Sequence, residues 1–370
     1  MAKIIIIGGG FGGLSFLQKA RKSKNDFILI DKTNHHLFQP LLYQVATAVL
    51  SPADITVPLR NLFKNDKNVK TILSEVKEIN REKKEITLDN AEVISYDKLI
   101  ISAGSSYSFF GKNEWSKFAK GLKVINDALD IREKILKAFE KAENEKDERI
   151  RKKYLNFVIV GGGPTGVELA GSIAEIAYKN MTKEFRNFSS TDANIYLLEA
   201  GDRILPSYSE SLAKKSYKFL NDLGVKVMTK ERVENIEEMK VTTNKQVIYA
   251  DNIIWAAGNE ASPLIKYLDT ETDNEGRAVV NLDCSIKEDN EVYVIGDAAN
   301  FKTESGESLP GIAPVAIQQG RYVAHNIKKN IEKEKRKPFR YSDKGTMATI
   351  GRFKAIGVVG NFELAGFTAW

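Results

Sequence analysis

The chain carries one short unit twice: a run of β-branched residues, a glycine-rich turn and the start of a helix. The first copy is KIIII at 3–7, followed by GGGFGG and a helix predicted over 11–22. The second is LNFVIV at 155–160, followed by GGGPTG and another helical pattern. Each copy leads into a further apolar strand, at 27–31 and 195–199. Strand, turn, helix and strand form a βαβ unit, so the sequence predicts an α/β fold with two Rossmann-like dinucleotide-binding domains.

The first turn has the G-x-G-x-x-G spacing, with Gly8, Gly10 and Gly13. The first glycine permits the tight turn, the second lets the backbone approach a pyrophosphate, and the third lets the helix pack against the strand. The helix N-terminus then offers free N–H groups and the positive end of its dipole to phosphates. Asp31 ends the next strand, where a carboxylate accepts hydrogen bonds from a ribose diol. This context favours a dinucleotide site over a purely structural turn.

The second turn repeats the spacing with Gly161, Gly163 and Gly166. The acid that ends the following strand is Glu199, which lies farther along than the usual ~20 residues. A carboxylate there repels the 2′-phosphate of NADP, although Arg203 nearby could soften the repulsion, so we expect NADH rather than NADPH. Two dinucleotide sites in one chain imply electron transfer between two carriers, a flavin and a nicotinamide.

Two further patterns support these sites. The phrases YDKLIISAG at 96–104 and ADNIIWAAG at 250–258 are alike, which strengthens the inference of a duplication and adds Gly258 to the cofactor-binding candidates. VYVIGDAA at 292–299 predicts a strand that runs into a turn. Gly296 and Asp297 in that turn suit a hydrogen bond to the ribityl hydroxyls of a flavin.

Composition excludes several classes of protein. The chain has one cysteine, Cys284, which rules out an internal disulfide or a redox cysteine pair, and its three histidines are too scattered to predict a metal site.

No run of about 18 apolar residues is present, so we expect no membrane-spanning helix. The net charge of +6 is modest. The densest basic cluster, Lys328 to Arg340, is interrupted by acids and is expected to be a solvated helix face, so we expect no nucleic-acid partner.

Three segments carry a family resemblance. FQPLLYQVATAVLSPADI at 38–55, PGIAPVAIQQG at 310–320 and GTMATIGR at 345–352 resemble segments of the type II NADH dehydrogenases. These are single-subunit, non-pumping NADH:quinone oxidoreductases within the two-dinucleotide-binding-domain flavoproteins. The resemblance covers essentially the whole chain. It implies the cofactors FAD and NADH, with a hydride passed from NADH C4 to flavin N5 and then two electrons to a quinone.

The resemblance also implies residue roles. Gln318 and Ala316 would lie at the quinone end of the flavin ring, and Thr47 near the isoalloxazine. Glu168 would lie between nicotinamide and flavin and assist proton movement, and Lys344 would approach the flavin. Val76, Ala103 and Gly104 would line the FAD adenosine and pyrophosphate. Two of these roles have structural alternatives: Gln318 could be an ordinary polar residue of a helix, and Glu168 could simply favour the helix dipole.

The expected organisation has a discontinuous FAD-binding domain at 1–115 and 285–335. The NADH-binding domain at 116–284 includes a helical connector at 125–154. A C-terminal segment at 336–370 is expected to pack on the FAD-binding domain and to stop before the family's membrane anchor. The resemblance further implies a homodimer that lies peripherally on the cytoplasmic face of the inner membrane, or a soluble protein without that anchor.

Rival functions remain open at this point. A disulfide oxidoreductase or a sulfide:quinone reductase needs a cysteine pair beside the flavin, which this chain lacks. A ferredoxin- or rubredoxin-type reductase needs the same two nucleotide sites and would be recognised by activity with an iron–sulfur acceptor. A redox-sensing flavoprotein would show slow turnover and redox-dependent assembly.

Overall fold

The computed structural model describes residues 1–370, and the chain divides into two units. Unit 1 comprises Met1–Leu37, Thr56–Ser106 and Asn259–Asp343. Unit 2 comprises Phe38–Ile55, Tyr107–Gly258 and Lys344–Trp370. Each unit contains one five-stranded parallel sheet with helices packed on it, so the predicted α/β class with two Rossmann-like cores is confirmed.

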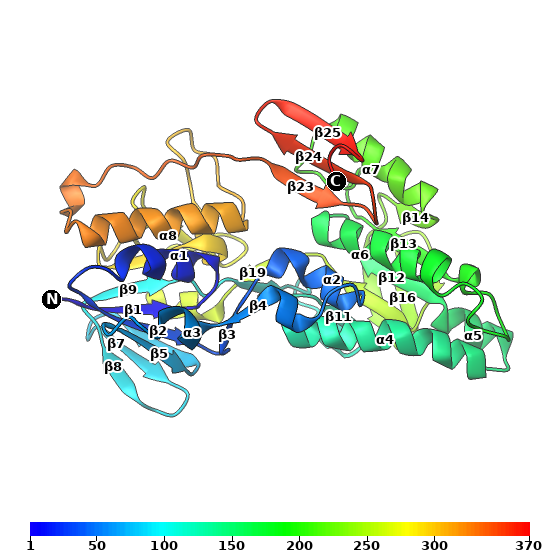
Figure 1. The fold of residues 1–370 in the computed structure, drawn as a ribbon, viewed down its shortest axis with the longest axis horizontal. Coiled ribbons are helices and arrows are strands. Elements are labelled where there is room, and N and C mark those ends of the chain that lie inside the picture. The colour runs from blue at the N-terminus through cyan, green and yellow to red at the C-terminus, as the bar shows by residue number, and fades with distance from the viewer. The chain divides into compact units, whose positions relative to one another are not determined.

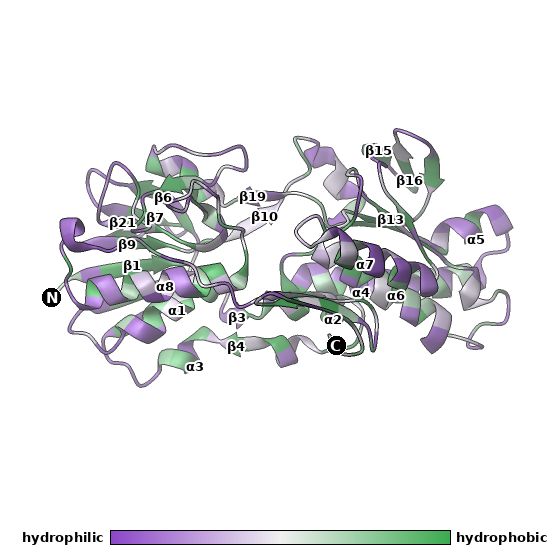
Figure 2. Cartoon of the chain, turned by 90° about the horizontal axis from the view of Figure 1, so that it is seen from above, coloured by the Kyte–Doolittle hydropathy of each residue, from purple (hydrophilic) through white to green (hydrophobic).

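The sheet of unit 1 has the order β21-β9-β1-β2-β5, and all its strands are parallel. Ile4, Ile5 and Ile6 of β1 are fully buried on both faces, which is why this strand is a continuous apolar run. Figure 2 shows the hydrophobic character of β1 and β9. The strands span Val292–Val294, Lys98–Ile101, Lys3–Ile7, Asp26–Asp31 and Val69–Leu73, in sheet order.

Helices α1 (Phe11–Ala20) and α8 (Ala313–Lys328) lie side by side over this sheet (Figure 1). A Cβ atom at Gly320 would lie 2.3 Å from the carbonyl oxygen of Gly12, so the two helices approach too closely for a side chain there. Unit 1 also contains the short helix α3 (Leu59–Phe63) and two strand pairs, β3 (His35–Leu37) with β4 (Thr56–Pro58) and β20 (Ala278–Val280) with β22 (Ala299–Phe301). A small antiparallel sheet is formed by β6 (Val76–Asn80), β7 (Glu85–Leu88) and β8 (Val93–Ser95).

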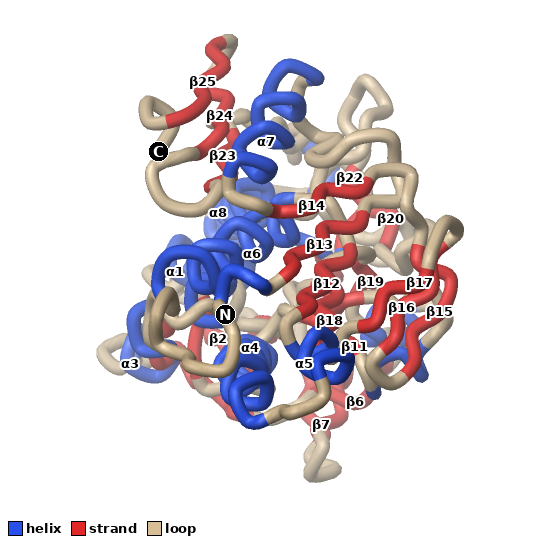
Figure 3. Tube along the Cα trace, turned by 90° about the vertical axis from the view of Figure 1, so that its right-hand side faces the viewer, coloured by secondary structure: helices blue, strands red, loops and turns tan.

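The sheet of unit 2 has the order β11-β18-β12-β13-β14, again all parallel (Figure 3). Its strands span Ala119–Gly121, Asn252–Trp255, Asn156–Val160, Asn194–Leu198 and Val225–Met228, in sheet order. The strand before each glycine-rich turn, β1 or β12, lies between the strand that follows its helix and a strand from much later in the chain. The two units therefore repeat one topology, as the duplicated sequence pattern predicts.

The helices of unit 2 are α2 (Leu42–Ala46), α4 (Ile125–Asn144), α5 (Glu148–Tyr154), α6 (Pro164–Glu175) and α7 (Glu210–Asp222). Its small antiparallel sheets are β15 (Val233–Glu237), β16 (Lys240–Thr243) and β17 (Val247–Tyr249), and β23 (Thr346–Thr349), β24 (Ala355–Val359) and β25 (Phe362–Gly366). The chain passes from one unit to the other five times, after residues 37, 55, 106, 258 and 343, and β10 (Ser105–Tyr107) and β19 (Asn259–Ala261) lie at two of these crossings. No helix is both long enough and apolar enough to cross a bilayer.

The observed division differs from the expected boundaries in three places. Residues 38–55 belong to unit 2, because α2 packs on α4 and α6. Residues 259–284 belong to unit 1, where Ala278, Val280 and Cys284 are part of the apolar core. The tail packs on α6 and α7 of unit 2, so the expectation that it packs on the first domain is wrong. Motif order in the sequence located the two βαβ units but carried no information on these contacts.

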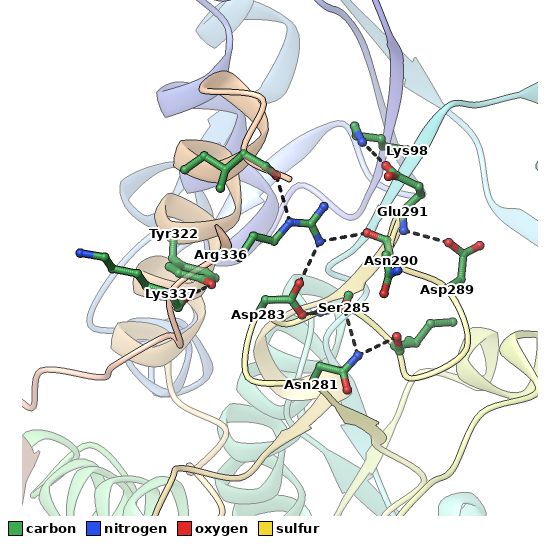
Figure 4. A network of polar contacts seen from close by, with 12 residues as sticks. Lys98, Asn281, Asp283, Ser285, Asp289, Asn290, Glu291, Tyr322, Arg336 and Lys337 are labelled. Atoms are coloured by element: carbon green, nitrogen blue, oxygen red, sulfur yellow. Dashed lines mark hydrogen bonds and ion pairs between the residues drawn. The ribbon is translucent and has the colours of Figure 1, made fainter. Parts of the chain in front are cut away.

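The basic cluster also differs from expectation. Helix α8 ends at Lys328, so most of the cluster lies beyond it and does not form a face of that helix; only a short 3₁₀ turn, Lys333–Lys335, follows within the cluster. The side chain of Arg336 is only 6% exposed, and its Nη1 donates to Asp283 Oδ2 at 2.8 Å and to the carbonyl of Asn290 at 3.2 Å (Figure 4). Its guanidinium also lies over the ring of Tyr293, 5.4 Å from the ring centre. This ion pair holds the segment after α8 against the rest of unit 1. The position of Arg336 in a run of charged residues does not indicate this structural role.

Candidate functional site

In the first glycine-rich turn, two of the three motif glycines have no room for a side chain and the third does. Gly8 has a φ of +99°, and a Cβ there would lie 2.2 Å from the carbonyl oxygen of Ser102. A Cβ at Gly13 would lie 2.0 Å from the carbonyl oxygen of Gly8. At Gly10, by contrast, no atom lies within 4 Å of the Cβ position. The open glycine is the one whose backbone must approach a pyrophosphate, so this turn fits a bound dinucleotide.

Asp31 is held rigidly beside that turn. Its Oδ2 accepts the N–H of Gly9 at 2.6 Å, and its Oδ1 accepts both the N–H (2.6 Å) and the hydroxyl (2.7 Å) of Thr33. His36 Nδ1 lies 2.9 Å from the carbonyl oxygen of Gly9. The sequence analysis missed Thr33 and His36. An aspartate two residues before a threonine is a recognisable local capping pattern that could have identified Thr33, whereas nothing in the sequence indicates the His36 contact.

The turn at Gly296 and Asp297 lies in the same unit and is held by two side chains. Gln319, buried to 1% exposure, accepts the N–H of Gly296 at 2.8 Å, and Ser105 donates its hydroxyl to Asp297 at 3.1 Å. The Cβ of Ala316 lies 3.2 Å from the Cβ position of Gly296. Gln319 lies in the segment 310–320, but the sequence analysis did not single it out or foresee its contact with Gly296.

Unit 1 thus brings most of its predicted residues to one edge of its sheet. Strands β1, β9 and β21 are adjacent and parallel, so the residues that follow them lie together. The predicted residues after these strands are Gly8, Gly10, Gly13, Ala103, Gly104, Gly296 and Asp297. Asp31 ends the neighbouring strand β2, and Ala316 of α8 lies against Gly296. Val76 differs, since it begins β6 and its side chain is buried in the apolar core.

Gln318 makes a paired contact with the chain after α8. Its Nε2 donates to the carbonyl of Ser342 at 2.9 Å, and its Oε1 accepts the N–H of Ser342 at 3.0 Å. Both halves of the amide are therefore engaged by one backbone residue. This contact joins α8 to the last residues of unit 1, and sequence spacing does not reveal it.

The second glycine-rich turn has the same construction as the first. Gly161 has a φ of +111°, and its Cβ position lies 2.8 Å from the carbonyl oxygen of Ala256. The Cβ position of Gly166 lies 1.9 Å from the carbonyl oxygen of Gly161, whereas that of Gly163 has no neighbour within 4 Å. The open middle glycine again fits a bound pyrophosphate.

Glu199 plays the part in unit 2 that Asp31 plays in unit 1. Its Oε2 accepts the N–H of Gly162 at 2.7 Å, and its Oε1 accepts the N–H of Gly201 at 2.6 Å. Arg203 donates to the carbonyl of Pro206 at 3.0 Å. The arginine thus has a backbone partner of its own, while the carboxylate is oriented by two N–H groups.

Glu168 lies in α6, two residues after Gly166, and its surroundings alter its acidity. Burial raises the pKa of Glu168 to about 8, although a hydrogen bond from the backbone N–H of Thr349 opposes the shift. The Thr349 hydroxyl lies 2.6 Å from the hydroxyl of Tyr43, which also accepts a hydrogen bond from Gln44 at 2.9 Å. Burial raises the pKa of Tyr43 as well, and the charge of Glu168 contributes. Three chain segments of unit 2 therefore meet around one carboxyl group that is largely protonated near neutral pH.

The other predicted residues of unit 2 are less informative. The Thr47 hydroxyl donates to the carbonyl of Tyr43 at 2.9 Å and is buried at the end of α2. Lys344 is exposed and begins the last segment of unit 2. Gly258 has a φ of +71° and follows β18. Tyr43 and Thr349 were missed by the sequence analysis, although both lie in segments that the family resemblance singled out.

Comparison with known proteins agrees with this geometry. The pattern of the pyridine nucleotide-disulphide oxidoreductase family matches residues 2–320. The type II NADH:quinone oxidoreductase NdhA of Mycobacterium tuberculosis is 39% identical over 385 residues, an alignment that covers 100% of this chain and 81% of the relative. The type II NADH:quinone oxidoreductase of Staphylococcus haemolyticus is 29% identical, with 98% and 91% covered. The solved structure of NDH2 from Plasmodium falciparum in complex with NADH has a TM-score of 0.91 at 23% identity, with 99% of this chain and 91% of that chain covered.

Proposed function

The chain belongs to the type II NADH:quinone oxidoreductases, and on that premise we propose that unit 1 binds FAD and unit 2 binds NADH. The observation that carries this assignment is the repeated turn. In each unit two glycines are closed off by backbone, the middle one is open, and a fixed carboxylate ends the next strand. The chain has a single cysteine, Cys284, which is fully buried, so it has no cysteine pair for the disulfide chemistry of its wider family.

The two turns and their acids act mainly by positioning. The open glycines and helix N-termini bind pyrophosphates, and Asp31 and Glu199 bind ribose hydroxyls. FAD, when bound, supplies the chemistry of accepting a hydride from NADH and passing two electrons to a quinone. Asp297, fixed by Ser105 beside Gly296, is proposed to hold ribityl hydroxyls, while Ala103 and Gly104 line the pyrophosphate and the backbone of Val76 the adenosine.

Glu168 is proposed to manage a proton near the nicotinamide. Since its pKa is about 8, the carboxyl can hold a proton at neutral pH and release it without a large free-energy cost. The Thr349 N–H, which bonds to this carboxyl, is proposed to orient it, and the Tyr43 hydroxyl, which bonds to the Thr349 hydroxyl, is proposed to hold strand β23 beside it. The remaining predicted residues of unit 2, Thr47, Gly258 and Lys344, are each proposed to contact a bound cofactor.

Gln318 and Ala316 are proposed to border the quinone end of the flavin site. Ala316 supports this because it packs on Gly296, beside the proposed ribityl-binding turn. The paired contact of Gln318 with Ser342 suggests that its amide acts by fixing the chain after α8. This role is positional rather than chemical.

We also propose that the protein is a homodimer and that it attaches peripherally to the cytoplasmic face of the inner membrane. The support for membrane attachment is the sheet β23–β25 and the turns around it, which expose large apolar side chains at Met347, Phe353, Phe362, Phe367 and Trp370. Flotation with vesicles tests the attachment, and light scattering tests the dimer.

Anaerobic oxidation of NADH by the FAD-loaded protein, with and without a short-chain quinone, tests the function. Rapid quinone-dependent oxidation is the expected result. Bleaching of the flavin by NADH without quinone turnover would favour another acceptor, such as an iron–sulfur protein, or a slow redox sensor. If NADH did not bleach the flavin, the assignment of unit 2 would be wrong.

A further inference from the structure

A tight turn just inside unit 2 contains a phenylalanine in an unfavourable backbone conformation. Lys112 donates its N–H to the carbonyl of Phe109 at 3.0 Å, which closes the turn. The two central residues, Phe110 and Gly111, both have positive φ, at +51° and +82°. Turns with positive φ at both central positions favour Asn-Gly, because a large side chain is strained there. Phenylalanine at this position therefore needs a reason other than turn formation.

Packing does not supply that reason. The preceding residue, Phe109, is a core residue with 4% exposure, whereas Phe110 is 68% exposed. The Phe110 ring stands edge-on to Trp255, with ring centres 6.2 Å apart. A Cβ at Gly258 would lie 2.7 Å from Cζ of Phe110, so the ring lies directly against that glycine. The side chain thus covers a backbone segment and leaves most of its surface free.

The covered segment lies at the nucleotide-binding edge of the sheet. Trp255 ends β18 and is paired with Val160, which immediately precedes the second glycine-rich turn. The Cβ position of Gly161 lies 2.8 Å from the carbonyl oxygen of Ala256. Residues 256–258 therefore run beside that turn at the carboxyl ends of parallel strands, where ligands of such sheets bind. Phe110 adds an exposed ring to this edge.

Strand order decides which half of a dinucleotide the ring would meet. Glu199 follows β13, on one side of β12, and an acid at this place binds the adenosine ribose. Residues 256–258 follow β18, on the other side of β12. A dinucleotide whose pyrophosphate lies at the turn after β12 therefore extends its second nucleoside toward β18.

We propose that Phe110 is a binding residue for the nicotinamide nucleoside of NADH, whose apolar faces pack against its exposed ring. This inference rests on the proposed assignment of NADH to unit 2. An aromatic ring recognises a flat heterocycle and a sugar face by contact area and stacking. The binding site retains a strained phenylalanine because glycine or asparagine would suit the turn but offer no such surface.

The test compares Phe110→Ala and Phe110→Gly with the parent, all as the FAD-loaded full chain. Calorimetric titration gives the Kd of NAD⁺ and the Kd of ADP, which lacks the nicotinamide nucleoside. We expect both variants to bind NAD⁺ about three- to tenfold more weakly, with ADP binding unchanged. Because glycine accepts positive φ without strain, Phe110→Gly should unfold at the same temperature as the parent or higher, which separates lost binding from lost folding.

Met239→Gly is the matched control. Met239 also has a positive φ, +53°, but lies in the turn between β15 and β16, so the change should alter neither Kd. Unchanged NAD⁺ binding in Phe110→Gly, or an equal loss of NAD⁺ and ADP binding, would overturn the inference. If the parent bound neither nucleotide, the assignment of unit 2 would itself be wrong, and the inference would fail with it.

Discussion

The two glycine-rich turns share a construction and differ in how firmly they are held. In both, the residue between the first two glycines donates its N–H to the acid that ends the next strand: Gly9 to Asp31, and Gly162 to Glu199. The carbonyls of Gly9 and Gly162 are also both engaged, by His36 Nδ1 at 2.9 Å and by the N–H of Leu205 at 2.8 Å. The first turn has one further tie, because the Ser102 hydroxyl oxygen accepts the N–H of Gly13 at 2.9 Å. The additional hydrogen bond at Gly13 suits a cofactor that stays bound, whereas the second turn suits a nucleotide that must bind and leave at each turnover.

The largest effect should come from filling the closed glycines. Gly13→Ala places a methyl group against the carbonyl oxygen of Gly8, so we expect about 1–3 kcal/mol of destabilisation and loss of bound FAD. Gly10→Ala is the matched variant, because its Cβ position is open; it should fold normally and only weaken FAD binding. Thermal unfolding and flavin absorbance measure the two effects. Equal loss of stability in both variants would show that the turn is not constructed as described.

A second prediction concerns retention of FAD by the first turn. Asp31→Ala removes the acceptor of three hydrogen bonds and of the ribose, so the purified protein should lose most of its flavin, with FAD affinity at least about tenfold weaker. Thr33→Val removes only one of those hydrogen bonds and should retain most of the flavin. Full flavin content in Asp31→Ala would place FAD elsewhere.

A third prediction concerns the selectivity of the second turn. Glu199→Gln removes the negative charge and leaves a single acceptor for two N–H groups, so KM for NADH should rise about tenfold. KM for NADPH should change less or fall, because the carboxylate no longer repels the 2′-phosphate. Steady-state kinetics with both nucleotides measures the ratio. A parallel rise for both would mean that Glu199 only supports the turn.

Sequence patterns predicted the parts of the fold that depend on local chemistry. Glycine spacing and β-branched runs located both βαβ units, because the tight turn and the buried parallel strand each require particular residues. Long-range partners were not predictable in this way. Gln319 at Gly296, Thr349 at Glu168 and Gln318 at Ser342 connect segments whose proximity depends on tertiary packing. The tail was misplaced for the same reason, since its contacts with α6 and α7 leave no local pattern.

The helices that follow the two turns differ at one position, where only the second has an ionisable residue. Two residues beyond the last glycine of the motif stands Ser15 in unit 1 and Glu168 in unit 2. Only the second turn therefore carries an ionisable group there, and burial raises its pKa to about 8. The serine shows that the turn itself does not require an acid at this point.

Glu168→Gln should therefore alter the pH dependence of stability and of flavin reduction more than it alters the affinity for NADH. Because burial raises the pKa above its usual value, the folded protein binds the proton more tightly than the unfolded chain. The resulting stabilisation is fully present below the ordinary pKa of a glutamate and is lost as pH rises toward about 8. In the glutamine variant this slope should disappear from thermal unfolding measured between these pH values, and the limb near pH 8 should disappear from the rate of flavin reduction by NADH. Ser15→Ala, at the equivalent place in unit 1, should leave both profiles unchanged. A parent profile without a limb in this range would show that the Glu168 proton takes no part in the reaction.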